Sequence, residues 1–352
     1  MSEKEALVNA KSLESFVTAL FRHVGMEQRD AVFSANAMVR TNLWGIDSHG
    51  VLRLPIYIRR LRSGAVKAKP DIKKIRGSQA LEVLHGDDGL GFIVGREAMD
   101  RAIQLAEKFN VGIVGAIRSN HFGAAALYTR MAAERNMVGL AMTNVIPNMV
   151  MPGCSKPVVG NNPIAIAAPT FQEFPFVLDV SLSAVAGGKL LMASKKKEKI
   201  PLNWATDREG RPTDDPDKGF AGFLLPMGGH KGFGLALAVD ILCGVLSGGV
   251  FLNEMKGMYH YPDDPSLTGH LMIAINFPSL MDQEEMKSRM ESFCKTVKSA
   301  PMWDSSQEML LPGEIEHRTF QERSKNGIPM PSKLIEDLAD LGKELGVPES
   351  LI

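Results

Sequence analysis

Apolar residues recur at helical spacing over the first eighty residues of the chain. The first predicted helix has Ser12 as its N-cap and stops at Gly25. Its apolar face consists of Leu13, Phe16, Val17, Leu20 and Phe21. Two further helices are predicted over 30–43 and 48–63. The pattern therefore predicts that the N-terminal part is made of helices.

Short, uninterrupted apolar runs replace this periodicity in the middle of the chain. The predicted strands are 111–117, 138–142, 164–168, 174–178 and 271–275. Runs that are apolar on both faces are typical of buried strands. The helical stretches that alternate with them are 97–109, 123–134 and 232–246. The middle is therefore predicted to be α/β.

The chain after Pro331 is predicted to form one amphipathic helix. Its apolar face consists of Leu334, Leu338, Leu341 and Leu345. A length of 352 residues suits about two domains, and 45% hydrophobic with 23% charged residues is the mixture of a globular protein.

Charge and cysteine usage narrow the class of protein further. Lys plus Arg equals Asp plus Glu, at 40 each, so the chain lacks the net positive charge expected of a nucleic-acid binder. Its three cysteines are scattered without a CxxC pair, which favours a reducing compartment such as the cytoplasm. Neither a secretory signal nor a run of about 18 apolar residues occurs, so no membrane association is expected.

Several familiar catalytic and nucleotide-binding motifs are absent. No Gly-x-Gly-x-x-Gly follows a strand, and neither Gly89-Leu-Gly91 nor Gly232-Phe-Gly234 has the third glycine. An ordinary Rossmann phosphate site is therefore not supported. The chain also lacks a P-loop, a Gly-x-Ser-x-Gly elbow and a His-Glu-x-x-His pair. Its eight histidines are scattered, so no metal site is predicted.

The first candidate constellation is Asp47-Ser48-His49, followed by Arg53. On the predicted third helix, His49 and Arg53 would stand on one face with their Cβ atoms about 5–6 Å apart. A 2-hydroxy acid needs a group that exchanges the hydroxyl proton, as His does, and one that holds the carboxylate, as Arg does. Asp47 and Ser48 are expected to orient the imidazole. The alternative is a helix-capping histidine with Arg53 on the surface.

The second constellation is the run from Arg118 to Gly123, which contains Asn120 and His121. It follows a predicted strand, and the carboxyl ends of strands in α/β sheets are where ligands usually bind. His121 is therefore a site candidate. The alternative is an ordinary loop residue.

Two further stretches are suited to binding anions and sugar hydroxyls. Asp179 at a strand end, followed by Ser181 and Ser183, suits ribose hydroxyls and a pyrophosphate, although a helix cap would look the same. Glycines around Lys231 at a helix start let backbone N–H groups and an ammonium approach an anion, although a plain helix-start turn would look similar.

These stretches, in this order, resemble the malate/L-lactate dehydrogenase family of the non-Rossmann type. The family includes ureidoglycolate dehydrogenase, sulfolactate dehydrogenase and diketogulonate reductase. The matching segments are 47–53, 119–123, 160–163, 167–169, 178–181, 203–205, 212–216, 231–234 and 311–314. Each motif alone is weak, but their joint order and spacing are specific, and the resemblance covers nearly the whole chain.

The resemblance implies an α/β fold with a family-specific, non-Rossmann nicotinamide-binding sheet domain. That domain is expected over 81–304. A helical domain built from both chain ends is expected over 1–80, joined by 305–352. The resemblance also implies a homodimer.

The resemblance assigns roles to individual residues. His49, with Ser48, matches the proton donor or acceptor, and Arg53 matches the carboxylate clamp. His121 matches a second active-site histidine, so which of the two carries the proton stays open. Asn120 is expected on the substrate side. The implied cofactor-binding residues are Asp179, Val180, Ser181, Ser183, Ala184, Lys231, Gly232, Gly313 and Glu314.

The function expected from these observations is an NAD(P)-dependent 2-hydroxy acid dehydrogenase acting on a small carboxylate, with malate or L-lactate as first candidates. NAD is the expected cofactor and NADP is the alternative. Rival functions are the same machinery acting on ureidoglycolate, sulfolactate or a cyclic imino acid, or a nucleotide-binding protein without turnover. A metal-dependent hydrolase has no clustered ligands to support it.

Overall fold

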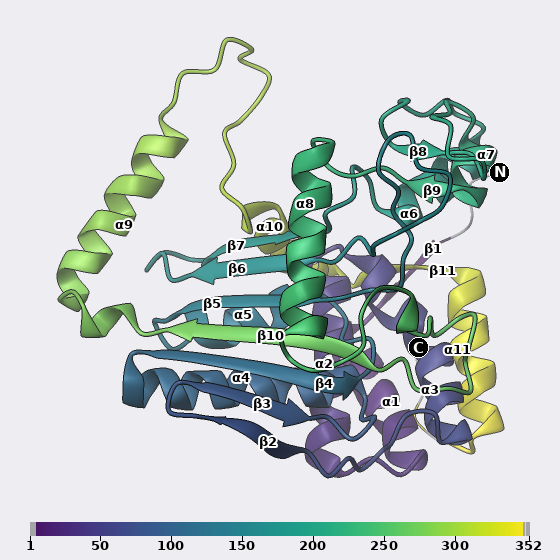
Figure 1. Ribbon diagram of the computed structural model, residues 1–352, viewed down its shortest axis with the longest axis horizontal. Helices are drawn as coiled ribbons and strands as arrows, with labels where there is room; N and C mark the ends of the chain where they lie inside the picture. Colours follow the sequence, from purple (N-terminus) through teal and green to yellow (C-terminus); the bar gives the residue numbers. More distant parts are fainter. Residues whose placement is uncertain (1–4, 348, 350–352) are drawn as a thin grey trace.

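A mixed seven-stranded sheet lies at the centre of the computed structural model, which describes residues 5–347 and 349 (Figure 1). In spatial order its strands are β2 (Lys73–Ser78), β3 (Leu81–His85), β4 (Val111–Ser119), β10 (Thr268–Ile275), β5 (Val138–Thr143), β6 (Ile164–Ala168) and β7 (Phe176–Val180). Only β3 and β4 are parallel, and the other neighbours are antiparallel. The predicted α/β class is confirmed.

The central strand β10 shows why the apolar runs form the middle of the sheet. Its Ile273 pairs with Ile113 of β4 on one side and with Leu140 of β5 on the other. A strand hydrogen-bonded on both edges and covered on both faces has to be apolar throughout. Four of the five predicted strands are confirmed. The fifth lies two residues later than predicted, at 176–180, because Pro175 has no N–H to donate to the ladder.

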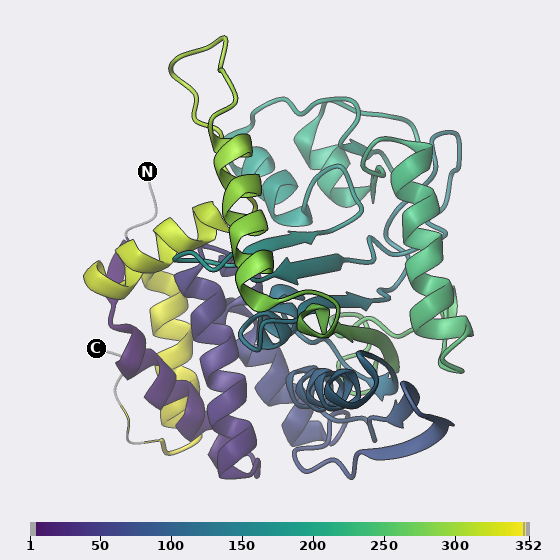
Figure 2. The same cartoon turned by 90° about the vertical axis from the view of Figure 1, so that its left-hand side faces the viewer.

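Helices cover the two faces of this sheet (Figures 1 and 2). On one face pack α4 (Gly91–Phe109) and α5 (Ala126–Ala133), and on the other lies α8 (His230–Asp240) with its π-helical continuation Ile241–Val245. Gly112 of β4 lets α4 come close, because a Cβ there would lie 1.9 Å from the Ala102 carbonyl oxygen. All three predicted helices of the middle are present, with shifted ends.

The two ends of the chain meet in a helical part beside the sheet. Strand β1 (Glu5–Val8) pairs antiparallel with β11 (Ile328–Pro331). The helices of this part are α1 (Ala10–His23), α2 (Gln28–Leu43), α3 (Leu54–Ser63), α10 (Glu314–Asn326) and α11 (Ser332–Glu344). The predicted C-terminal amphipathic helix is α11, whose Leu338 is fully buried in the same core as Leu13 and Phe16.

The prediction that the first eighty residues are helical is wrong at β1 and β2. The partner of β1 lies more than 300 residues away, so no local pattern reveals it. Every residue of β2 is exposed, so this strand has no apolar alternation to detect. Strand β3, just beyond this range, was also missed.

The predicted helix over 48–63 is also corrected by the structure. Two 3-10 turns, η1 (Asp47–His49) and η2 (Val51–Arg53), precede α3, which begins only at Leu54. The Asn42 side chain causes the interruption, because its Oδ1 accepts the Val51 N–H at 2.9 Å. A Cβ at Gly50 would lie 2.1 Å from that same oxygen, so only glycine fits against Asn42. His49 and Arg53 are therefore not on one helical face.

The remaining elements lie outside these layers. A small subdomain contains α6 (Gly187–Lys196), α7 (Pro216–Ala221) and the strand pair β8 (Ala205–Thr206) and β9 (Phe223–Leu224). Helix α9 (Gln283–Lys298) and the loop after it project from the body as an arm (Figure 1). None of the described helices combines the length and the apolar character needed to cross a membrane.

We expect Leu338→Ala to lower the free energy of unfolding by about 3 kcal/mol, because it opens a cavity where the two chain ends pack. The matched control is Leu202→Ala, whose side chain is 60% exposed, and it should change stability little. Denaturant unfolding monitored by circular dichroism measures both variants. Equal effects of the two substitutions would contradict the packing of α11 described above.

Candidate active site

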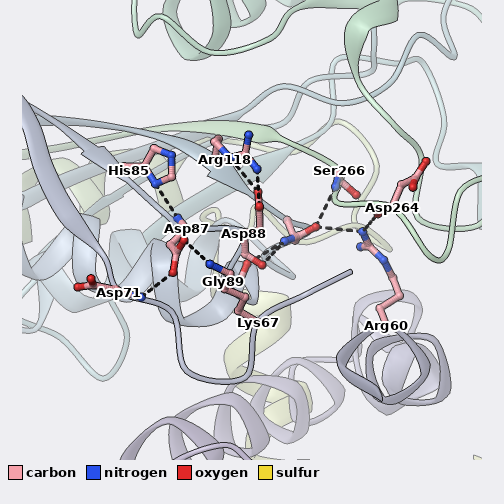
Figure 3. Close-up of polar contacts among 11 residues, drawn as sticks. Arg60, Lys67, Asp71, His85, Asp87, Asp88, Gly89, Arg118, Asp264 and Ser266 are labelled. Carbon is pink, nitrogen blue, oxygen red and sulfur yellow. Dashed lines mark hydrogen bonds and ion pairs between the residues drawn. The ribbon is translucent and has the colours of Figure 1, made fainter. Parts of the chain in front are cut away.

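Three segments that are distant in the sequence meet at the carboxyl end of β4. They are the turns leading into α3, the loop after Ser119, and the segment that precedes β10. Arg60 of α3 joins them, since its Nη2 donates to Asn120 Oδ1 at 3.0 Å and to the Asp264 carbonyl oxygen at 2.7 Å (Figure 3). Its side chain is only 1% exposed. The segments are thus held together by a buried guanidinium.

The Asn120 amide is the second half of this junction. Its Nδ2 donates to the carbonyl oxygens of Asp88 and Gly89 at 3.0 and 2.9 Å, and its Oδ1 also accepts the Ser266 N–H at 3.0 Å (Figure 3). Together with the Arg60 contact, these bonds use both amide hydrogens and both oxygen lone pairs. The Asn120 side chain therefore shapes the loop, and it has no free group for the substrate contact that was expected of it.

The imidazole of His49 projects from turn η1 beside a serine. Its Nδ1 lies 2.9 Å from Ser48 Oγ, as expected for a serine that orients the ring. Asp47 has a different role from the one predicted. Its Oδ1 accepts from Arg323 Nη1 at 2.8 Å and from Asn42 Nδ2 at 2.7 Å. This carboxylate ties the turn to α10 and α2 and does not contact the imidazole ring.

The guanidinium of Arg53 is oriented from two sides. Its Nε donates to the Ser48 carbonyl oxygen at 2.8 Å, and its Nη1 donates to the Tyr259 hydroxyl. The Tyr259 ring also lies against it, with Cζ 5.2 Å from the ring centroid. No acceptor for Nη2 is found among residues 5–347 and 349. The outer end of this guanidinium is therefore available to an anion.

The structure brings His121 against His49. The two rings stack with centroids 5.6 Å apart and an angle of 22° between their planes. On its other side, His121 Nδ1 lies 2.6 Å from the Tyr57 hydroxyl of α3. The two histidines that the sequence pointed to are thus neighbours, although 72 positions separate them.

Burial and the nearby cation keep both imidazoles neutral. Burial, and to a smaller extent the positive charge of Arg53, together lower the pKa of His49 to about 4. Burial also holds the pKa of His121 well below its usual value, with contributions from His49 and Arg53. A neutral imidazole can accept a proton at one nitrogen and donate at the other, which suits exchange with a hydroxyl group.

A third histidine supports the His121 loop from the sheet below. His270 of β10 lies with Nδ1 2.8 Å from Thr143 Oγ1 and Nε2 2.8 Å from Ser119 Oγ. Its ring is stacked on Phe122, with centroids 4.5 Å apart and planes within 6°. Burial lowers its pKa to about 3, so His270 is a neutral, fully hydrogen-bonded support.

Sequence reasoning missed Tyr57, Tyr259 and His270. Tyr57 stands four positions after Arg53, a helical spacing that marks it as a possible neighbour once α3 is recognised. His270 directly precedes a predicted strand, where a polar side chain between apolar neighbours is a detectable signal. Tyr259 lies in a turn, and nothing local in the sequence marks it.

Two of the three expected cofactor stretches lie side by side. The loop after β7 is hydrogen-bonded to the segment before α8, through Ala184 N to Leu225 O at 2.7 Å and Met227 N to Leu182 O at 2.9 Å. Ser181 Oγ and Ser183 Oγ lie 3.0 Å apart in this loop. These bonds place the loop close to Lys231, which is exposed at the start of α8, and to Gly232.

Asp179 connects this loop to the His121 loop. Its Oδ2 accepts the Ala126 N–H at the start of α5 at 2.8 Å. Asp179 thus makes the helix-cap contact that the sequence offered as the alternative. Burial raises the pKa of Asp179 to about 6. Backbone hydrogen bonds from Ala126 and Ala125 oppose this rise. Val180 belongs to edge strand β7 and pairs with Ile164.

The third expected stretch lies along the first half of β7. The Pro312 carbonyl oxygen accepts the Val177 N–H at 3.0 Å, and Gly313 follows with a φ of 93° that favours glycine. The Glu314 carboxylate accepts from Lys298 Nζ at 2.7 and 2.9 Å and from Arg318 Nη2 at 2.6 Å. Glu314 is therefore engaged by cations of this chain. The described residues contain no group of three or more potential ligands placed to hold a metal ion.

Comparison with known proteins gives consistent matches over the whole length. A family model described as malate/L-lactate dehydrogenase matches residues 8–339. The L-sulfolactate dehydrogenase of Methanocaldococcus jannaschii is 37% identical over 341 residues, 97% of this chain and 98% of that protein. The malate dehydrogenase of Pyrococcus abyssi is 37% identical over 355 residues, 99% of this chain and 97% of that protein.

Solved structures show the same fold. The sulfolactate dehydrogenase from Methanocaldococcus jannaschii superposes with a TM-score of 0.92 at 36% identity, covering 97% of this chain and 98% of that one. The malate dehydrogenase from Pyrococcus horikoshii superposes with a TM-score of 0.90 at 36% identity, covering 99% and 100%.

We expect the His49 imidazole to titrate near pH 4 in the free protein. Because this folded-state pKa lies below the ordinary histidine value of 6.5, the stability that the group contributes is present above pH 6.5 and is lost as the pH falls toward 4. Replacing Arg53 by Met should raise the midpoint, because a repelling charge is removed. NMR of the ring resonances, assigned with His49→Gln, measures it, and a midpoint near 6.5 in both proteins would contradict the site described.

Proposed function

The chain belongs to the malate/L-lactate dehydrogenase family and is a 2-hydroxy acid dehydrogenase, and on that premise we propose that its substrate is malate or L-lactate. The observation that carries the proposal is the convergence of His49, His121 and the free end of Arg53 at one place. These are the groups that a 2-hydroxy acid requires.

Arg53 is proposed to hold the substrate carboxylate. Its guanidinium is fixed by Ser48 and Tyr259, so little side-chain freedom remains to be lost when an anion binds. A carboxylate on Arg53 places the C2 hydroxyl of the substrate on the adjacent carbon. The stacked histidines beside Arg53 are then the groups available to exchange the hydroxyl proton.

The family uses nicotinamide cofactors, and we propose NAD for this chain, with NADP as the alternative. Bound nicotinamide supplies the hydride acceptor or donor. The residues fit such a group, because the Asp179 carboxylate lies at the end of β7, where it could accept from a ribose hydroxyl, and Lys231 stands exposed at a helix start, where phosphate is favoured. Ser181, Ser183 and Ala184 belong to the loop that is hydrogen-bonded to the segment before α8, where Gly232 follows Lys231.

The names of the relatives favour a second candidate substrate. Sulfolactate dehydrogenases and malate dehydrogenases match this chain at nearly equal identity. Malate and sulfolactate share a 2-hydroxy acid and a second anionic group on the next carbon, and L-lactate lacks that group. Sulfolactate therefore stands beside malate as a candidate.

We also propose that the protein is a homodimer. The exposed face of α8 and its continuation carries Leu235, Ile241, Leu242, Val245 and Leu246. An exposed apolar stripe along one helix face is typical of an interaction surface. A cytoplasmic location is proposed on the evidence of three cysteines that are all free.

Purified protein is expected to oxidise NADH or NADPH with one of oxaloacetate, pyruvate, sulfopyruvate, 2-oxoglutarate or piperideine-2-carboxylate. His49→Ala should lower kcat by about 10²- to 10⁴-fold, since it removes the proton-exchanging group. Arg53→Lys should act mainly through a higher KM, because the lysine ammonium cannot make the planar two-point contact that a guanidinium makes with a carboxylate. Nicotinamide absorbance follows the reaction.

Arg59→Lys is the matched control, because Arg59 lies on α3, the helix that follows Arg53, but is exposed and paired with Asp263. It should leave both constants nearly unchanged. Binding of NADH without turnover of any of these acids would favour a non-catalytic protein or another substrate. Failure to bind NADH and NADPH would contradict the cofactor proposal.

Light scattering after size exclusion should give twice the chain mass of 38.4 kDa. Leu246→Glu should shift the protein toward monomer, because it places a charge on the apolar face of a residue that is 69% exposed. Leu202→Glu, exposed but away from that face, should leave the mass unchanged. A monomer at all concentrations in the parent protein would refute the homodimer.

A further inference from the structure

Two donors converge on one nitrogen of His121. The Tyr57 hydroxyl lies 2.6 Å from Nδ1, and the backbone N–H of Gly123 donates to the same atom at 3.4 Å. A backbone N–H can only donate, so Nδ1 presents its lone pair in this arrangement. A neutral imidazole with a lone pair on Nδ1 carries its single hydrogen on Nε2.

The Tyr57 hydroxyl is suited to remain a donor. Its side chain is 1% exposed, and burial raises its pKa, so the phenol keeps its proton. The ring is held by an edge contact with Phe92, with centroids 5.6 Å apart at 86°, and by the near-parallel ring of His121 at 6.0 Å. Among the described residues, the only hydrogen-bond partner of this hydroxyl is His121.

We infer that Tyr57 is a positioning residue that fixes His121 as the Nε2–H tautomer, so that His121 faces the substrate as a hydrogen-bond donor and His49 exchanges the proton. The inference rests on the proposed function, because it assigns the roles of two histidines toward a 2-hydroxy acid. It also answers which of the two carries the proton.

The tautomer decides what His121 can do. Its Nε2 already carries a hydrogen, so it cannot take the hydroxyl proton unless the ring gives up its bonds at Nδ1. It can donate to the substrate oxygen, which stabilises negative charge as that charge develops. The other nitrogen, Nδ1, is closed by Tyr57 and Gly123.

No comparable pair of donors fixes the tautomer of His49 among the described residues. Its Nδ1 faces Ser48 Oγ, and a hydroxyl accepts as readily as it donates. With Nδ1–H donating to Ser48, the lone pair on Nε2 is free. In the oxidising direction His49 Nε2 would take the hydroxyl proton, and a bound NAD(P)+ would accept the C2 hydrogen as hydride. The products are a 2-oxo acid, NAD(P)H and protonated His49, which returns the proton to water.

The tautomer of His121 and the kinetic constants are measured separately. In protein labelled with 15N-histidine, the free wild type should show a protonated Nε2 and an unprotonated Nδ1 for His121. Tyr57→Phe keeps the ring but removes the donor, so a mixture of tautomers should appear. The pKa of His121 should also rise, because its neutral form loses a hydrogen bond. We expect kcat to fall by about 10- to 100-fold, with KM little changed.

Tyr128→Phe is the matched control. Tyr128 is also fully buried, and its hydroxyl donates to the Phe122 carbonyl oxygen at 2.5 Å, one residue from His121. The substitution removes a buried hydroxyl of α5 that donates to the His121 loop, without changing a contact of the imidazole. Stability should fall as in Tyr57→Phe, and the His121 tautomer should stay unchanged.

A protonated Nδ1 on His121 in the wild type would overturn the inference, whether or not any variant folds. An unchanged tautomer and unchanged kcat in Tyr57→Phe would overturn the positioning role. The spectrum needs no substrate. Absence of turnover with every 2-oxo acid would therefore count against the proposed function alone and leave the tautomer result standing.

Discussion

The buried guanidinium of Arg60 is the contact on which the site depends. A charge removed from water needs hydrogen-bond partners, and Arg60 finds them in Asn120 and in the carbonyl oxygens of Pro262 and Asp264. These partners come from the loop after β4 and from the segment before β10, so satisfying one side chain fixes the relative positions of both. His121 and Tyr259 lie in those two segments. Their distances to His49 and Arg53 on the N-terminal side thus follow from the solvation of a single cation.

Burial and the charge of Arg53 together set the protonation state of the histidines. Burial is the larger cause of their low pKa values, and Arg53 adds to it at both rings. An anion bound on Arg53 cancels that positive charge, so the proton affinity of the imidazoles rises when the substrate arrives. The protein therefore holds neutral histidines before binding and more basic ones afterwards. Recognition of the carboxylate and readiness for proton exchange are two effects of one guanidinium.

The sequence was informative where a signal is local. Apolar runs located β4, β5, β6 and β10, and the order of short motifs pointed to His49, Arg53 and His121. It failed where side chains from outside an element decide the structure of that element. Asn42 interrupts the predicted third helix from the neighbouring α2, and Arg323 takes Asp47 away from the imidazole. Tyr259 is supplied by a turn about 200 residues after Arg53. No window of the sequence contains both Asp47 and Arg323, or both Arg53 and Tyr259.

The Arg323–Asp47 contact has a consequence for synthesis of the protein. These residues are 276 positions apart, and strands β1 and β11 are joined across an even longer stretch. The turn that carries His49 cannot form its contact with Arg323 until residue 323 has left the ribosome and reached Asp47. Pairings of such long range are slow to form, because the entropy of closing the loop precedes any gain in contact energy. The nascent chain therefore carries both histidines long before it can bring them together, and catalytic competence arises as a late event of folding.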